Sequence, residues 1–291
     1  MSAPVGPRSS HSTLRAGSVA NRWAGVIVGT DGAVCAVGVR CDDEDRRVGE
    51  ALIVDLGPGQ IRARARLHFT VRAVAGTAAA PIVLDECGGL WRIDNDAAPV
   101  RLADGVHALV DRFALGENGV VLAVDKNPPR RVAEGARHVG AGVMVVDGGV
   151  QLIDRMIDGD TVLPLIPVAL PPHVSACHRD GAHVAIAGDK TVTLLDLAAG
   201  TARTLHAPRA IQSLARSPDR WLLGSTSSGL HVLDDGDDVM RALRPSLRAH
   251  QLARFGDAGV VAVADLSIST TDDGVEWLGR DLAGLVRLMQ A

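Results

Sequence analysis

Tyrosine is absent from this 291-residue sequence, which contains only 3 phenylalanines and 4 tryptophans. A hydrolase that uses a tyrosine nucleophile is therefore excluded, and a platform of aromatic rings that stacks on sugars is disfavoured. Hydrophobic residues nevertheless make up 47% of the chain, mainly as Val, Leu, Ile and Ala. Small and β-branched side chains suit strands, so this composition predicts a core built from sheets.

Local signatures of catalysis and of metal binding are also missing. The four cysteines are widely separated without a Cys-x-x-Cys pair, so we expect free thiols. The sequence contains no GxxxxGK, no HExxH and no nucleophile elbow. We therefore expect no cofactor and no metal. The densest group of soft ligands is His173, Cys177, His178 and His183, which we interpret as strand and turn residues because alternation places two of them on opposite faces.

Strong charge of one sign and long apolar runs are lacking as well. The net charge is -4, and no basic cluster is evident, so we expect no nucleic-acid partner. No uncharged apolar stretch reaches membrane-spanning length, and the N-terminus lacks the apolar core of a signal peptide. These features predict a cytoplasmic protein without a membrane partner. The N-terminal segment has no acid before Asp31 and carries Ser and Arg, which favours an unstructured tail over residues 1–20, with a transit peptide as the alternative.

A repeated unit is the main feature that is present. "RFALGENGVVLAVD" at 112–125 and "RFGDAGVVAVAD" at 254–265 share an Arg-Phe start, a glycine turn, an apolar strand and a final aspartate. The same order recurs along the chain. Seven units start at arginines, namely Arg22, Arg72, Arg112, Arg137, Arg179, Arg216 and Arg254. In six units the apolar strand runs into an aspartate, namely Asp31, Asp85, Asp125, Asp147, Asp189 and Asp265.

The spacing of these arginines predicts the architecture. Successive intervals are 50, 40, 25, 42, 37 and 38 residues, centred near the length of roughly 40–45 residues for a four-stranded propeller blade. The charged stretch "CDDEDRR" explains the first interval as a longer loop, and the shortest interval suggests that the third unit has lost a strand. Merging the third and fourth units leaves six blades as the alternative.

The units resemble degenerate blades of the WD40-like β-propeller superfamily. "GLWRID" at 89–94 and "GLHVLDD" at 229–235 are the nearest equivalents of its Trp-Asp strand. "STTDDGVEW" at 269–277 resembles an Asp-box, and this resemblance implies a hairpin corner that uses Thr270, Asp272, Gly274 and Trp277. We therefore predict an all-β, seven-bladed β-propeller of four-stranded antiparallel sheets over residues 21–280. A short amphipathic helix is expected over residues 281–291.

The repeated charges suggest how such a propeller would act. If each arginine ends an innermost strand, the seven arginines encircle one mouth of the central channel and can bind an anion or an acidic peptide. The aspartates would then form an acidic rim on the opposite face, although each arginine can instead pair with an acid of the adjacent blade. We predict a non-catalytic scaffold for protein partners. The resemblance implies a place in a bacterial multi-protein system, sometimes linked to an ATPase, and the alternative is a lactonase-like hydrolase or lyase with its site in the channel.

Overall fold

The computed structural model describes the backbone of residues 22–28, 33–41, 47–55 and 60–264, with short gaps at 68, 70, 78–79, 95–97, 126, 158, 218, 226, 245–248 and 256–258. Most side chains from Leu67 to Leu243 are described, as is that of Leu252. Several predictions fall outside the described residues, namely those for the tail 1–20, Asp31, Asp265, the hairpin 269–277 and the helix 281–291.

Strands form all the regular structure of the described residues apart from one short 3-10 helix, η1 (Glu117–Gly119). They make seven sheets in chain order, which we number 1 to 7. Sheet 1 contains β1 (Arg22–Val28), β2 (Ala33–Cys41), β3 (Arg47–Asp55) and β4 (Gln60–Leu67). Sheet 2 contains β5 (Val71–Gly76), β6 (Pro81–Asp85), β7 (Leu90–Arg92) and β8 (Val100–Ala103). Sheet 3 contains β9 (Val106–Val110), β10 (Phe113–Gly116), β11 (Val121–Ala123) and β12 (Arg130–Ala133).

The second half of the chain continues this pattern. Sheet 4 contains β13 (His138–Gly140), β14 (Val143–Val146), β15 (Gly149–Met156), β16 (Gly159–Val162) and β17 (Ile166–Pro167). Sheet 5 contains β18 (Val174–Asp180), β19 (His183–Gly188), β20 (Thr191–Asp196) and β21 (Thr201–His206). Sheet 6 contains β22 (Ser213–Ser217), β23 (Arg220–Ser225), β24 (Gly229–Asp234) and β25 (Arg241–Arg244). The described strands of sheet 7 are β26 (Ala249–Phe255) and β27 (Gly259–Ala264).

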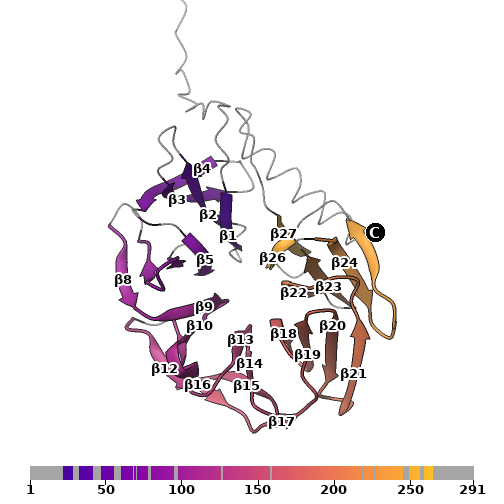
Figure 1. Cartoon of the computed structure of the whole chain (residues 1–291). Coiled ribbons are helices and arrows are strands. Elements are labelled where there is room, and N and C mark those ends of the chain that lie inside the picture. The colour runs from indigo at the N-terminus through magenta and orange to yellow at the C-terminus, as the bar shows by residue number, and fades with distance from the viewer. Residues whose placement is uncertain are drawn as a thin grey trace, which may run out of the picture.

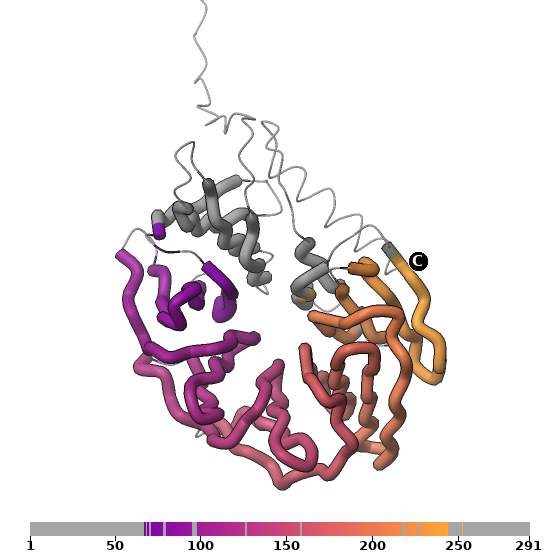
Figure 2. The backbone as a smooth tube through the Cα atoms, viewed as in Figure 1, coloured from indigo at the N-terminus to yellow at the C-terminus, as the bar shows by residue number. Residues whose placement is uncertain are grey.

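The sheets surround a common centre, and the chain visits them in sequence order (Figure 1). Figure 2 shows the same course for the backbone from sheet 2 to sheet 6. Each sheet is an antiparallel meander whose first strand lies innermost, and in sheet 4 the additional strand β17 pairs with β15. Neighbouring first strands contact one another in the order β1, β5, β9, β13, β18, β22 and β26, and β26 contacts β1. The all-β, propeller-type arrangement predicted from the sequence is therefore confirmed. Among the residues with described structure, no helix is long and apolar enough to cross a membrane.

Sheet 3 corrects one prediction. The third unit has not lost a strand, because sheet 3 has four strands, each of only three to five residues. The interval between Arg112 and Arg137 is short for a second reason as well. Arg112 follows the first strand of its sheet, whereas Arg137 precedes the first strand of the next sheet.

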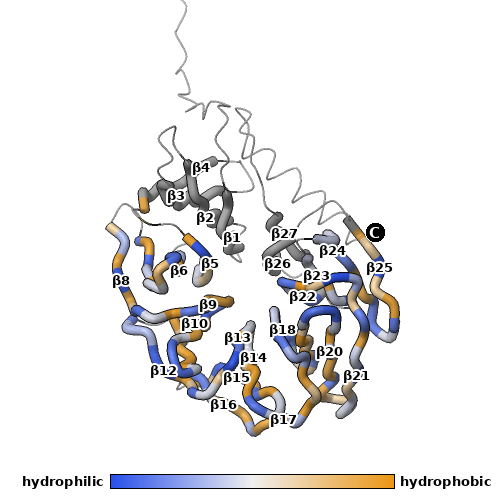
Figure 3. Tube along the Cα trace, viewed as in Figure 1, coloured by the Kyte–Doolittle hydropathy of each residue, from blue (hydrophilic) through white to orange (hydrophobic). Residues whose placement is uncertain are grey.

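The apolar core lies between neighbouring sheets. One cluster joins Phe113 and Val121 of sheet 3 to Met144 and Ile153 of sheet 4, and another joins sheets 5 and 6. Middle strands such as β19 belong to buried clusters with the sheets on both sides, sheet 4 and sheet 6. Such strands are mainly apolar in sequence, and Figure 3 shows hydrophobic stretches within the sheets alongside hydrophilic ones. Burial between sheets stabilises the fold by about 25 cal/mol for each Å² of apolar surface removed from water.

Candidate interaction surfaces

The meander gives the molecule two distinct faces. Because strand direction alternates, the turns after the first and third strands of each sheet lie on one face, which we call face A. The turns after the second strands and the linkers between sheets lie on the other, which we call face B. The arginines and aspartates of the sequence repeat that the structure describes each lie at one of these two faces.

Three of the seven arginines lie on face A within ion pairs. Arg112 follows β9, and its Nη1 lies 2.5 Å from Oδ1 of Asp160 and 3.9 Å from Oδ2 of Asp125. Its guanidinium also stands 4.5 Å from the centre of the Phe113 ring. Arg179, near the end of β18, pairs with Asp154 of sheet 4. Both arginines thereby connect adjacent sheets.

Arg216 has the most buried side chain of these three arginines. Its side chain is only 3% exposed, and it donates from Nη1 and Nη2 to the two carboxylate oxygens of Asp235 at 2.9 and 2.6 Å. Its guanidinium stands 5.2 Å from the centre of the Trp221 ring. The hydrogen bonds from Arg216 lower the pKa of Asp235. This bidentate geometry fixes the turn after β24 against the end of the first strand.

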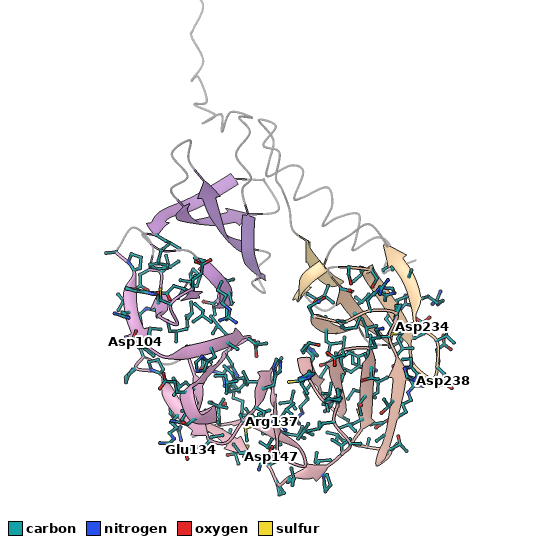
Figure 4. The ribbon with its side chains drawn as sticks, in the orientation of Figure 1. Asp104, Glu134, Arg137, Asp147, Asp234 and Asp238 are labelled. Atoms are coloured by element: carbon teal, nitrogen blue, oxygen red, sulfur yellow. The ribbon has the colours of Figure 1, made fainter. Side chains whose placement is uncertain are left out.

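The other four arginines occupy both ends of first strands. Arg254 lies near the end of β26, whereas Arg22 and Arg72 lie near the start of β1 and β5. Arg137 directly precedes β13, and its Nη1 lies 3.2 Å from Oδ1 of Asp147, with both side chains largely exposed. Figure 4 labels this pair. Both ends of a first strand lie outside the apolar interior, so an arginine can occupy either end. The sequence repeat therefore does not show on which face a given arginine lies.

The aspartates are divided between the faces in a similar way. Asp85 ends the second strand of its sheet, Asp147 and Asp189 directly follow theirs, and all three lie on face B. Asp125 follows the third strand β11, so the structure places it on face A beside Arg112 rather than on an opposite acidic rim. The apolar run before Asp125 reads as a second strand in the sequence, but β10 and η1 precede it. Arg137 and Asp147 likewise share face B, so neither pair separates into rims of opposite charge.

Asp85 shows the turn role that its type predicts. Its Oδ1 accepts hydrogen bonds from the backbone N–H groups of Cys87 and Gly89 at 2.8 and 2.7 Å. Its Oδ2 accepts a hydrogen bond from the indole of Trp91 at 2.7 Å. A Cβ atom at Gly89 would lie 2.4 Å from Asp85 Oδ2, so this corner requires glycine there.

Sequence reasoning missed a short linker motif. "RLADG" at 101–105 and "RVAEG" at 131–135 each join the last strand of one sheet to the first strand of the next. In both, the arginine pairs with the acid three residues later, and the glycine has a φ of 66 or 72°. The residues that follow, Val106 and Ala136, donate backbone hydrogen bonds to Gly88 and Gly119 of the preceding sheet. The similarity of the two pentapeptides is the signal that was available.

The first strands also carry exposed polar residues at their face B ends. Arg72, His107, Arg137 and Ser175 are exposed, and each follows an apolar residue that is buried or half-buried. They come from sheets 2, 3, 4 and 5, whose first strands are neighbours around the centre. We call these four residues the face B ring. Its two arginines and its histidine can contact carboxylate groups of a ligand.

The histidine and cysteine group does not converge. Cys177 is buried, and burial strongly raises the pKa of its thiol. The His178 ring instead lies edge-on to Trp221, with ring centres 5.9 Å apart. Within the described part of the chain, no group of three or more His, Cys, Asp or Glu side chains is placed to hold a metal ion.

Comparisons with known proteins identify the fold. No family model and no curated protein matches this chain. Among solved structures, Hsv2 of Kluyveromyces marxianus superposes with a TM-score of 0.55 at 13% identity, covering 84% of this chain and 89% of that one. BamB of Moraxella catarrhalis gives 0.52 at 16% identity, covering 86% and 82%. YCF48 of Cyanidioschyzon merolae gives 0.56 at 10% identity, covering 85% and 94%. All three are β-propellers, and this chain has a β-propeller fold similar to theirs.

Proposed function

We propose that this protein is a seven-bladed, WD40-like propeller that acts as a non-catalytic scaffold for a protein partner, in the cytoplasm. Seven sheets whose first strands contact one another in a closed series support the blade count. The scaffold proposal depends mainly on one observation, the face B ring of exposed side chains that lie on or directly before four adjacent first strands. A partner that presents an acidic segment would contact Arg72 and Arg137 by charge-assisted hydrogen bonds.

Ion pairs and one hydrogen bond on face A join neighbouring sheets, and they stiffen the propeller whose opposite face carries this ring. Arg112–Asp160 and Arg155–Asp125 connect sheets 3 and 4, and Arg179–Asp154 connects sheets 4 and 5. Arg203 connects sheets 5 and 6, because its Nη1 donates to the Asp237 carbonyl oxygen at 2.8 Å. A platform that does not rearrange loses little entropy when a partner binds.

Partner capture from native lysate tests the proposal. Arg72→Glu reverses a charge within the face B ring, and Arg101→Glu makes the same change on the outer strand β8, where Arg101 is 56% exposed. We expect wild type and Arg101→Glu to capture the same partner and Arg72→Glu to lose it. Equal capture by all three proteins would contradict the proposal. Absence of any captured chain, together with stoichiometric metal in the purified protein, would favour the channel enzyme instead.

A further inference from the structure

Arginine distinguishes the outermost strands of the sheets. Five of them contain one to three arginines and no acidic residue, namely β4, β8, β12, β21 and β25. An outermost strand presents unpaired backbone groups, and charged side chains are a common means of preventing other strands from pairing with it. The arginines therefore protect the edges of five sheets.

Sheet 4 is different. Its outermost strand β16 has the sequence Gly-Asp-Thr-Val and contains no arginine. Its acid, Asp160, is turned toward Arg112 of sheet 3. Thr161, in the middle of the strand, is exposed. Among sheets 1 to 6, sheet 4 alone thus lacks arginine on its outer edge, because β17, which pairs with β15 beside β16, contains none either.

Exposed apolar side chains flank this same strand. Ile157 is fully exposed, Met156 is 58% exposed, and both lie at the turn that leads into β16. Leu165, which is 44% exposed, follows β16 three residues after its end. These are three of the five large hydrophobic side chains that are exposed in the described part of the chain. Exposed apolar groups concentrated around one open edge are typical of an interaction site.

The register shows which backbone groups are available. Leu163 donates its N–H to Leu152, and Asp154 lies opposite Thr161, so residues 159, 161 and 163 direct their backbone groups toward β15. The N–H and C=O groups of Asp160 and Val162 therefore point away from the sheet. Arg130 of sheet 3 lies against Gly159, at the turn end of β16. A partner strand would consequently pair with Asp160 and Val162.

We propose that the outer edge of β16 is a docking site for an extended, apolar segment of a partner protein, which adds as a further strand to sheet 4. Backbone hydrogen bonds to Asp160 and Val162 would provide affinity, and contacts with Ile157, Met156 and Leu165 would select apolar side chains. A four-residue edge is too short to bury the roughly 1,200 Å² of a stable protein dimer, which favours a peptide segment over a second copy of this chain. The site is separate from the face B ring and does not depend on it.

Peptide binding tests this site. The probe is a fluorescent hexapeptide of alternating Thr and Val with blocked ends, titrated with the full chain. Thr161→Arg gives β16 the kind of residue that the other outermost strands have. Thr201→Arg is the matched control on β21, where Thr201 is also exposed and Arg203 is already present. We expect Thr161→Arg to weaken peptide binding about tenfold or more, and Thr201→Arg to leave it unchanged.

Two further readouts complete the experiment. Hydrogen exchange with bound peptide is expected to slow at the amides of Asp160 and Val162, and Arg72→Glu is expected to bind the peptide as wild type does. The proposal is overturned if the peptide does not bind or if both threonine variants bind equally. It is also overturned if sedimentation shows that the free chain self-associates through β16, because the occupant would then be a second copy.

Discussion

His231 is a buried residue whose titration contributes to stability. It lies in β24, is only 4% exposed, and its Nε2 is 2.9 Å from the hydroxyl of Ser228. Burial lowers the pKa of His231 in the folded protein, so the unfolded chain binds more protons as the pH falls. The free energy of unfolding should therefore decrease as the pH drops below about 6.5, the ordinary value for histidine. Burial lowers the pKa of His138 too, which adds in the same direction.

A histidine variant tests this pH dependence. His231→Gln keeps a hydrogen-bonding group near Ser228 but does not titrate. We expect urea unfolding of this variant to show a smaller loss of stability than wild type between about pH 7.5 and about pH 5.5. His138 should account for part of the remaining dependence. An equal loss in both proteins would contradict the role assigned to His231.

Among the elements, β13 and β18 make an unusually close contact between sheets. The N–H of Arg179 donates to the Ala141 carbonyl oxygen at 3.0 Å, and Ala141 forms an isolated bridge with His178. A Cβ atom at Gly140 would lie only 1.8 Å from the carbonyl oxygen of Cys177. The absence of a side chain at this position is therefore what allows sheets 4 and 5 to approach.

Gly140→Ala should separate these two sheets. We expect it to reduce the free energy of unfolding by about 3 kcal/mol or more, because the clash is with backbone rather than with a flexible side chain. Gly200→Ala is the control, since nothing lies within 4 Å of its Cβ position and only its positive φ of 65° is unfavourable. That strain should cost about 1–2 kcal/mol. Similar losses in the two variants, measured by urea unfolding, would contradict the close-contact argument.

The positions of the sheets along the chain could be predicted from the sequence, because they depend on side chains within each sheet. Each of the seven repeated arginines falls in or directly beside a different sheet, because the repeat follows the alternation of apolar runs and polar turns. The order of strands within sheet 3 was not predictable in this way. There β10 has only four residues, and the apolar run at 120–124, which contains the third strand β11, resembles a second strand in the sequence.

At the scale of the whole molecule, the packing of the sheets determines which residues form ion pairs, and the sequence alone does not predict these partners. Arg112 and Asp160 are 48 positions apart in the sequence, yet they form an ion pair. Arg179 pairs with an acid of the preceding sheet, whereas Arg216 pairs within its own sheet. Residue type predicts that these arginines form ion pairs with acidic residues, but the packing of the sheets determines which acidic residue each one meets. The exposed edge of β16 also becomes evident only when its strand is compared with the outermost strands of the other sheets.

The closed series of sheets should make unfolding of the chain depend on the presence of every sheet. First strands contact one another from β1 round to β26, which also contacts β23. Leu252 of β26 packs against a buried cluster of sheet 6 that includes Leu222 and Val232. A chain that ends after Arg244 removes β26 and β27 and would expose apolar surface on sheets 1 and 6 together. Because total stability is only about 5–15 kcal/mol, we expect this truncation to abolish cooperative urea unfolding.

A circular permutant cut at the exposed turn between Ala198 and Ala199, with the original ends joined by a long Gly-Ser linker, retains every sheet and should unfold cooperatively. A truncated chain that unfolds cooperatively at the wild-type urea midpoint would show that the sheets do not depend on a closed ring.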